Sequence, residues 1–182
     1  MGELAEKTIS SNQLFTGKLL KLRIDAVELP NGVQATREVV EHPGAVAVVA
    51  LTEKDELVLV RQFRQAVGQV LLELPAGVPH QGESIIAAAK RELAEETGYQ
   101  AKSVSQIWSA YSSPGYSNEI IHYCLAKELA PVAANADEDE LVEVDHVPLK
   151  QCLAWLKEGK INDGKTIIGI YLALLHCHAR TI

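Results

Sequence analysis

A continuous apolar run, Ala45–Leu51 with the sequence AVAVVAL, sets the strongest limit on the folds open to this chain. Valine favours strands, and an apolar run of this length is typical of a β-strand buried inside a sheet. The run is too short to cross a membrane, since a spanning helix takes about 20 apolar residues. It therefore predicts a buried strand that other elements of the chain must cover.

Segments typical of strands and helices alternate on both sides of this run. Pro30-Asn31-Gly32 separates two strand-like segments, and Asn-Gly is a strong signal for a hairpin turn. We expect strands over 19–29, 33–41, 45–51, 57–63, 71–74, 104–111, 120–126 and 142–147, and helices over 84–97, 150–158 and 166–177. Strands interleaved with three helices predict a sandwich of the α/β (α+β) class.

The composition excludes several kinds of protein. The chain of 182 residues carries 17 basic and 24 acidic ones, and its net charge of −7 disfavours general binding to DNA or RNA, which needs a positive field. The segment Met1–Ser10 is polar and lacks the apolar centre of a signal peptide. The three cysteines form no Cys-x-x-Cys pair, which is typical of a reducing compartment. We therefore expect a cytoplasmic protein without a nucleic-acid or membrane partner.

The helix expected over 84–97 carries three carboxylates within little more than one turn. Glu92 and Glu96 are four residues apart and share one face of the helix, and Glu95 flanks that face. These like charges repel one another, and they lie near the helix C-terminus, where the dipole disfavours negative charge. Such a break with a local stability rule is expected mainly at functional sites.

A divalent cation would offset this repulsion. Because the available ligands are all oxygens, Mg²⁺ or Mn²⁺ suits them better than zinc. The loop at Gly77 leaves backbone carbonyls free, which makes the carbonyl of Ala76 a further candidate ligand. Arg91 lies four residues before Glu95 and eight after Glu83, and pairing with both would hold the carboxylates in place.

The stretch that contains these residues also resembles a known family. Residues 77–99, GVPHQGESIIAAAKRELAEETGY, fit the Nudix box GX5EX7REUXEEXGU at every fixed position. The match covers 23 residues, and the order of the expected strands is compatible with the Nudix fold over about residues 41–182. The resemblance implies a Nudix-type α/β/α sandwich with a mixed sheet in residues 42–182. It also implies a small antiparallel β-sheet in residues 1–41 that serves dimerisation.

The resemblance implies a reaction class as well. Members of this family are Mg²⁺-dependent hydrolases that act on a nucleoside diphosphate linked to another group. By this resemblance, Glu92, Glu96 and the carbonyl of Ala76 bind metal. Glu95 and Arg91 lie beside them and complete the catalytic group.

Two further segments indicate a branch of the family. Ser113–Glu119 (SPGYSNE) resembles the SPGxxxE signature of ADP-ribose and nucleoside-diphosphate-sugar pyrophosphatases, and Glu73–Gly77 (ELPAG) resembles the lead-in to their box. A Pro-Gly turn is rigid. It would place Ser113 and Glu119 to hydrogen-bond a ribose or a base.

Three arginines are candidates for binding the diphosphate, because a guanidinium is always charged and binds phosphate through two parallel hydrogen bonds. Arg61 and Arg64 are three residues apart, so they point to opposite faces if one strand runs through both. Arg64 is the better match to the phosphate-binding arginine of the resembling enzymes. Arg37 matches an N-terminal arginine that reaches the nucleotide bound by the partner subunit.

A second acidic cluster occupies residues 137–140, with the sequence DEDE. In the resembling enzymes this loop supplies a catalytic base and a further metal ligand. Aligning the strand that follows assigns the base to Glu138 and the ligand to Glu140. A shift of one residue would assign them to Asp137 and Asp139 instead.

The segment Asp163-Gly164-Lys165-Thr166 precedes the last expected helix. An Asp-x-Lys-Thr element recurs in this branch of the family, including the GDP-mannose hydrolases. From the residues themselves, Asp163 and Thr166 are more typical of a helix start, where a carboxylate accepts hydrogen bonds from the first turn, than of catalysis.

These observations predict hydrolysis of the pyrophosphate bond of ADP-ribose to AMP and ribose 5-phosphate, with Mg²⁺ bound and Glu138 as general base. The main alternative is GDP-mannose or another nucleoside diphosphate sugar, cleaved by the same mechanism. A sensor that binds a nucleotide sugar without turnover would lack box carboxylates or carry a DNA-binding domain, and an RNA-decapping enzyme would need a basic surface. An N-terminal sheet of this kind would leave an apolar face open in a monomer, so we also expect a homodimer.

Overall fold

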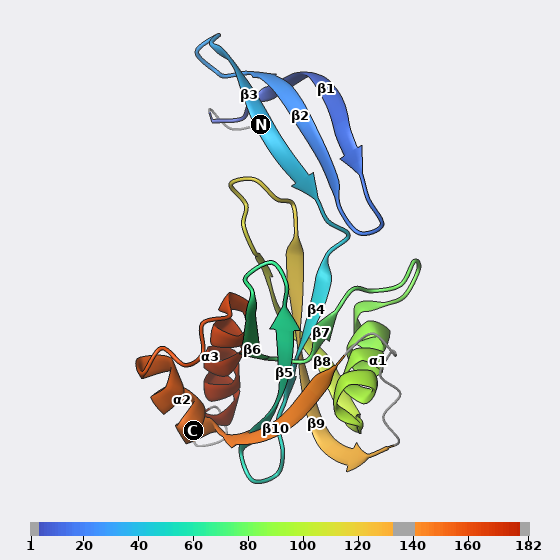
Figure 1. The fold of residues 1–182 in the computed structure, drawn as a ribbon, viewed down its shortest axis with the longest axis vertical. Helices are drawn as coiled ribbons and strands as arrows, with labels where there is room; N and C mark the ends of the chain where they lie inside the picture. Colours follow the sequence, from blue (N-terminus) through green and yellow to red (C-terminus); the bar gives the residue numbers. More distant parts are fainter. Residues whose placement is uncertain (1–3, 133–140, 179–182) are drawn as a thin grey trace. The chain divides into compact units, whose positions relative to one another are not determined.

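The structure, a computed structural model, describes residues 4–132 and 141–178. Its contacts divide the chain into two compact units (Figure 1). One unit contains the described residues up to Gly44 together with Tyr111–Ile120. The other contains the rest of the described chain.

The first unit is a three-stranded antiparallel sheet in the order β1-β2-β3, with β1 at Lys7–Thr16, β2 at Lys21–Glu28 and β3 at Gln34–Glu41. The predicted turn between β2 and β3 is confirmed: Gly32 has a φ of +81°, and its N–H donates to the carbonyl of Leu29 at 2.9 Å. Strand β1 begins well before the first expected strand. Every one of its residues is exposed, so its sequence has no alternation of buried and exposed positions from which to predict it.

The second unit is built on β4 (Ala45–Ala50), the strand predicted from the apolar run. This strand pairs in parallel with β9 (Ile120–Pro131) and antiparallel with the short β7 (Ala76–Gly77), and β8 (Tyr99–Tyr111) completes the order β7-β4-β9-β8. A second, antiparallel sheet has the order β10-β5-β6, formed by β10 (Val142–Pro148), β5 (Glu56–Arg64) and β6 (Gln69–Glu73). Strand pairing of both kinds confirms the mixed β-structure.

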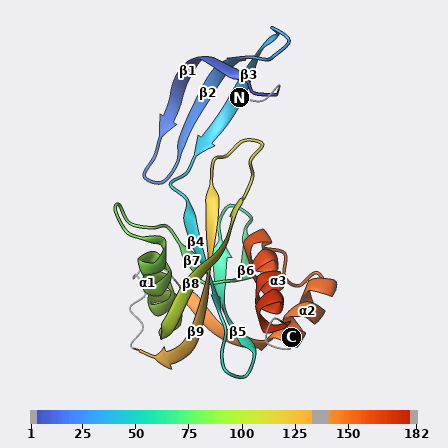
Figure 2. The same ribbon diagram turned by 180° about the vertical axis from the view of Figure 1, so that it is seen from behind.

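Three helices cover these sheets, with α1 (Ile85–Thr97) on one side and α2 (Leu149–Lys157) and α3 (Gly164–His178) on the other (Figures 1 and 2). Side chains of β4 alternate between two cores. Ala47 and Val49 pack into the cluster that includes residues of α3, and Val48 packs into the cluster that includes residues of α1. All three are fully buried, so the apolar run is continuous because both of its faces are covered. The predicted α/β/α sandwich is confirmed.

Helix α1 begins and ends where its sequence signals predict. The hydroxyl of Ser84 accepts a hydrogen bond from the N–H of Ala87, and Gly98 ends the helix in the left-handed conformation, with φ of +67°. Ala89 and Leu93 are fully buried against the sheet. Within the described part of the chain, no helix is long and apolar enough to cross a membrane.

Candidate active site

The acidic face of α1 lies against the segment that leads into it. Glu92 and Glu96 are buried, with 8% and 7% of their surface exposed, whereas the side chain of Glu95 is 38% exposed. One carboxylate oxygen of Glu96 accepts a hydrogen bond from the backbone N–H of Ala76 at 3.0 Å. The backbone of Ala76 therefore lies directly beside one of the two buried carboxylates.

Arg91 connects the carboxylates around it. Its Nε and Nη2 donate to the two carboxylate oxygens of Glu83 at 3.1 and 2.9 Å, and its Nη1 donates to Glu92 at 2.8 Å and to Glu95 at 2.9 Å. A further hydrogen bond joins Nη2 to the carbonyl of Val78 at 3.2 Å. The structure thus contains both pairings expected for Arg91, with Glu83 and with Glu95, and adds a third with Glu92.

Around Arg91, negatively charged carboxylates outnumber the single positive charge of the guanidinium. Hydrogen bonds from Arg91 and from the backbone N–H of His80 lower the pKa of Glu83 to about 2. The same pair with Glu83 raises the pKa of Arg91 further above its already high value. One guanidinium contacts three carboxylates, and Glu96 adds a fourth on the same helix. The face therefore attracts a cation.

Gly77 leaves the room that the Glu92 carboxylate needs. A Cβ at this position would lie under 3.0 Å from both oxygens and the carbon of the Glu92 carboxylate. Only glycine therefore lets this carboxylate pack against the loop. Two buried carboxylates beside the backbone of Ala76 offer oxygen donors, which fit a hard divalent cation such as Mg²⁺ or Mn²⁺.

The ligand set is incomplete in the described part of the chain, where no three acidic, histidine or cysteine side chains gather closely enough to hold a metal ion. The predicted base Glu138 and the predicted ligand Glu140 lie outside the described residues, as do Asp137 and Asp139. Their roles stay predictions from the sequence.

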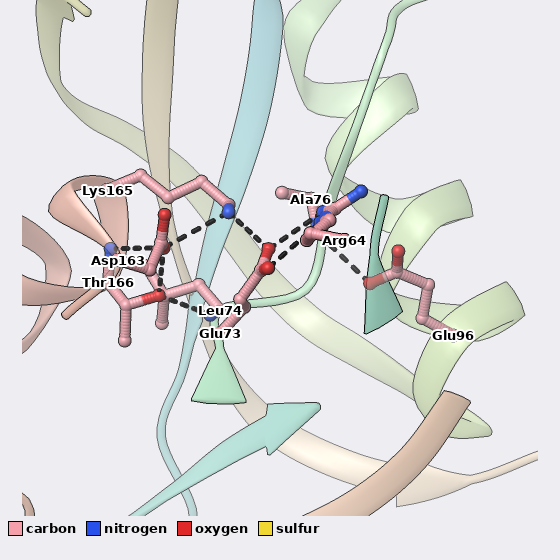
Figure 3. Close-up of polar contacts among 8 residues, drawn as sticks. All are labelled: Arg64, Glu73, Leu74, Ala76, Glu96, Asp163, Lys165 and Thr166. Atoms are coloured by element: carbon pink, nitrogen blue, oxygen red, sulfur yellow. Dashed lines mark hydrogen bonds and ion pairs between the residues drawn. The ribbon is translucent and has the colours of Figure 1, made fainter. Parts of the chain in front are cut away.

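The two arginines of β5 have different partners. Arg64 Nε and Nη2 donate to the two carboxylate oxygens of Glu73 at 2.9 and 2.7 Å (Figure 3). Arg61 instead pairs with Asp145 of β10 at 2.5 Å. Arg64 therefore lies at the end of β5 beside the segment that leads to Ala76, and its selection over Arg61 stays a prediction.

The partners of Arg64 were not among the residues predicted from the sequence. The Glu73 carboxylate is only 1% exposed and also contacts the ammonium group of Lys165, at the start of α3 (Figure 3). Burial raises the pKa of Glu73, but hydrogen bonds from Arg64 and the charge of Lys165 outweigh it, and the pKa ends below its ordinary value. Glutamate inside the otherwise apolar LLELPAG stretch is the signal that would have identified it.

The remaining predicted substrate residues lie in the first unit. Arg37 forms an ion pair with Glu6, with 3.0 Å between Arg37 Nε and a carboxylate oxygen. The carbonyl of Ser113 accepts hydrogen bonds from two N–H groups within its own turn, and Glu119 accepts one from the hydroxyl of Ser112. A pocket of about 490 Å³ contains Arg37 and the Pro-Gly turn; its lining is Glu6, Arg37, Glu38, Val39, Tyr111 and residues 114–118.

The chain matches known proteins over most of its length. It matches the family model of the NUDIX domain over residues 41–168 and that of the nucleoside diphosphate sugar hydrolase N-terminal domain over residues 6–40. It is 45% identical to the methanol dehydrogenase activator of Bacillus methanolicus over 178 residues, and 45% identical to the ADP-ribose pyrophosphatase of Bacillus subtilis (strain 168) over 177 residues. Both alignments cover 96% of this chain and 96% of the relative.

Two more distant matches extend this comparison. The chain is 36% identical to the GDP-mannose pyrophosphatase of Yersinia enterocolitica (serotype O:8 / biotype 1B) over 171 residues, which cover 87% of this chain and 88% of that protein. A crystal structure of an ADP compounds hydrolase matches with a TM-score of 0.86 and 23% identity, over 96% of this chain and 95% of that chain. At this level of identity the match establishes the fold alone.

Proposed function

Because this chain belongs to the Nudix family, we propose that it hydrolyses the pyrophosphate bond of ADP-ribose to AMP and ribose 5-phosphate. The observation that carries the proposal is the acidic face of α1, where Arg91 holds Glu92 and Glu95 beside the Gly77 loop. The relatives named ADP-ribose pyrophosphatase support the choice of substrate.

In this proposal, Glu92, Glu96 and the carbonyl of Ala76 hold the divalent metal, Mg²⁺ or Mn²⁺. When bound, the cation would offset the negative charge of the diphosphate. Arg91 keeps the carboxylates of α1 oriented, because its guanidinium is anchored on Glu83 and on the carbonyl of Val78.

Residues of this chain also bind the substrate and move the proton. Arg64 would bind a phosphate, and Glu138 would accept the proton of the attacking water. Arg37, Ser113 and Glu119 would bind the nucleoside. The pocket beside the Pro-Gly turn supports the role of Arg37, because it places this guanidinium among aromatic and polar side chains.

We also propose a homodimer formed through the N-terminal strands of residues 1–41, with residues 42–182 as the hydrolase domain. Strand β1 lies at the edge of its sheet and exposes Ile9, Leu14 and Phe15, an arrangement that a second copy would cover. Size-exclusion chromatography with light scattering at micromolar protein is expected to give twice the mass of the chain. A monomer at that concentration would contradict the proposal.

The proposed location is the cytoplasm, supported by three free cysteines among the described residues, of which Cys124 and Cys152 are buried. The second candidate substrate is GDP-mannose, which the Yersinia relative of this chain is named for. It would be cleaved with the same residues.

A hydrolysis panel tests the proposal. Purified protein with Mg²⁺ is given ADP-ribose, GDP-mannose, a dinucleoside polyphosphate and a deoxynucleoside triphosphate, and the products are separated by chromatography. The highest kcat/KM with ADP-ribose, together with AMP as product, supports the proposal. A higher value with GDP-mannose moves it to the alternative, and tight nucleotide-sugar binding without turnover in Mg²⁺ or Mn²⁺ would identify a sensor instead.

Two variants separate metal binding from proton transfer. Glu96→Gln is expected to weaken Mg²⁺ binding in a metal titration, whereas Glu138→Gln is expected to bind Mg²⁺ normally and to lose about 10²–10⁴-fold in kcat. Glu53→Gln, an exposed change in the same unit, is the matched control. Normal kcat in Glu138→Gln would remove that residue from the role and direct the same test to Asp137 and Asp139.

A further inference from the structure

Glu73 is a fully buried carboxylate that three elements of the fold share. It ends β6, and its oxygens accept hydrogen bonds from Arg64 at the end of β5 and from Lys165 at the start of α3. The side chain of Lys165 is only 14% exposed and also lies 3.1 Å from the carboxylate of Asp163. Figure 3 shows the two cations approaching Glu73 from opposite sides.

The backbone around Glu73 is fixed by the same cluster. Asp163 accepts hydrogen bonds from the N–H and the hydroxyl of Thr166 at 3.0 and 2.6 Å, which confirms the predicted helix start. The hydroxyl oxygen of Thr166 in turn accepts the N–H of Leu74 at 2.8 Å. Two residues later, the N–H of Ala76 donates to Glu96 of α1. The segment from Glu73 to Ala76 is thus tied to α3 at one end and to α1 at the other.

Stability alone does not explain a buried ion cluster at this position. Taking charges out of water is unfavourable, and well-packed apolar side chains of similar volume often stabilise a protein equally well. Retained charges of this kind point to a role beyond stability, and within the described residues the Arg64 guanidinium keeps N–H donors that no hydrogen bond uses. Its side chain is 41% exposed, whereas its partner Glu73 is buried.

The geometry leaves one side of the Arg64 guanidinium available. Nε and Nη2 form the two parallel hydrogen bonds with Glu73, and among the described residues Nη1 has no hydrogen bond. The planar guanidinium carries five N–H donors in fixed directions, so the side-on pair with Glu73 determines where the remaining donors point. Because Lys165 offsets part of the negative charge of Glu73, the positive charge of Arg64 is neutralised less than it would be if Glu73 paired with Arg64 alone.

We infer that Glu73 is a positioning residue that orients Arg64 for a phosphate of the substrate, with Lys165 as the counter-charge that keeps this carboxylate in place. The inference rests on the proposed function, because it takes Arg64 as a phosphate ligand. Glu73 itself contacts no substrate.

The first test is spectroscopic and needs no substrate. In a ¹⁵N–¹H spectrum, the Arg64 Nε–H signal, assigned through its loss in Arg64→Lys, is expected to exchange slowly with solvent in the wild type. In Glu73→Gln this exchange is expected to be at least about tenfold faster, since the amide offers one acceptor in place of two charged ones. The control Glu53→Gln is expected to leave the signal unchanged. Unchanged exchange in Glu73→Gln would overturn the inference.

The second test is kinetic. Glu73→Gln is expected to raise the KM for ADP-ribose about tenfold, with kcat within about threefold of the wild type, because it weakens a contact made to substrate and transition state alike. In an Arg64→Ala background the same change is expected to alter KM by less than about twofold, because the residue on which Glu73 acts is gone. Additive effects in this double-mutant cycle would show that Glu73 acts elsewhere and would overturn the inference.

A buried substitution can prevent folding, and a second variant covers that case. Glu73→Gln combined with Lys165→Met removes one negative and one positive charge together, and Lys165→Met alone is its reference. The double variant is expected to show the same rise in KM and faster Arg64 exchange relative to this reference, and no difference would overturn the inference. Absence of turnover in the wild type would instead count against the proposed function, while the Arg64 signal would still test the positioning.

Discussion

Gly77→Ala is expected to displace the Glu92 carboxylate while leaving the stability of the fold nearly unchanged. Gly77 is not among the glycines with positive φ, so alanine adds no backbone strain at this position. Its Cβ would, however, lie under 3.0 Å from all three atoms of the Glu92 carboxylate, whereas ordinary contacts begin at 3.4 Å. The carboxylate is the far end of a flexible side chain and has to move by about 1 Å, a displacement that can reduce a catalysed rate about 10²-fold.

We therefore expect Gly77→Ala to lower kcat/KM for ADP-ribose about 10²-fold, equivalent to about 2.7 kcal/mol of transition-state stabilisation. Steady-state kinetics at saturating Mg²⁺ measure the first quantity. Urea unfolding is expected to show a change in the free energy of unfolding of less than about 1 kcal/mol. Gly164→Ala, where a Cβ meets open space, is the matched control and is expected to keep wild-type kinetics. A kcat/KM within about threefold of the wild type in Gly77→Ala would refute the reasoning.

Four other substitutions test the Glu83–Arg91 pair, the hydrogen bonds of Thr166 and the choice between Arg64 and Arg61. Because hydrogen bonds from Arg91 lower the pKa of Glu83 to about 2, this pair adds stability above the ordinary pKa of 4.5 that is lost as the pH falls toward 2. The stability difference between wild type and Glu83→Gln in urea unfolding should shrink over that range, and a constant difference would contradict the assignment. Thr166→Val leaves the backbone N–H of Leu74 without its acceptor and removes one of the hydrogen bonds to Asp163, so it should lower the free energy of unfolding by about 1–3 kcal/mol in the same assay, with under about 0.5 kcal/mol counting against it. Arg64→Ala should raise the KM for ADP-ribose at least about tenfold and Arg61→Ala less than about threefold, and the reverse order would move the phosphate contact to Arg61.

Sequence patterns predicted the elements that depend on residues close to one another in the chain. The apolar run identified β4, because covering both faces of a strand removes every polar position from it. The carboxylate spacing in α1, with Ser84 before it and Gly98 after it, determined both the helix and its acidic face. These features depend on neighbours within a few residues, which a sequence displays directly.

Features that depend on distant partners were not predictable in this way. Strand β1 exists because it pairs with β2, and its own residues are all exposed and show no alternation. Glu73 and Lys165 are 92 residues apart in the chain, and only the fold shows that they share a buried ion cluster. The Asp-x-Lys-Thr segment was correctly interpreted as a helix start, but the partner of its lysine was missed because nothing local indicates it.

The most direct test of the metal site is the anomalous scattering of Mn²⁺ in crystals of the protein. A strong peak is expected beside the Glu92 and Glu96 carboxylates and the carbonyl of Ala76, the groups that would hold the metal. In Glu96→Gln the peak is expected to be lost or much weakened at the same Mn²⁺ concentration. A peak away from α1, or full occupancy in Glu96→Gln, would contradict the claim that this helix face holds the catalytic metal.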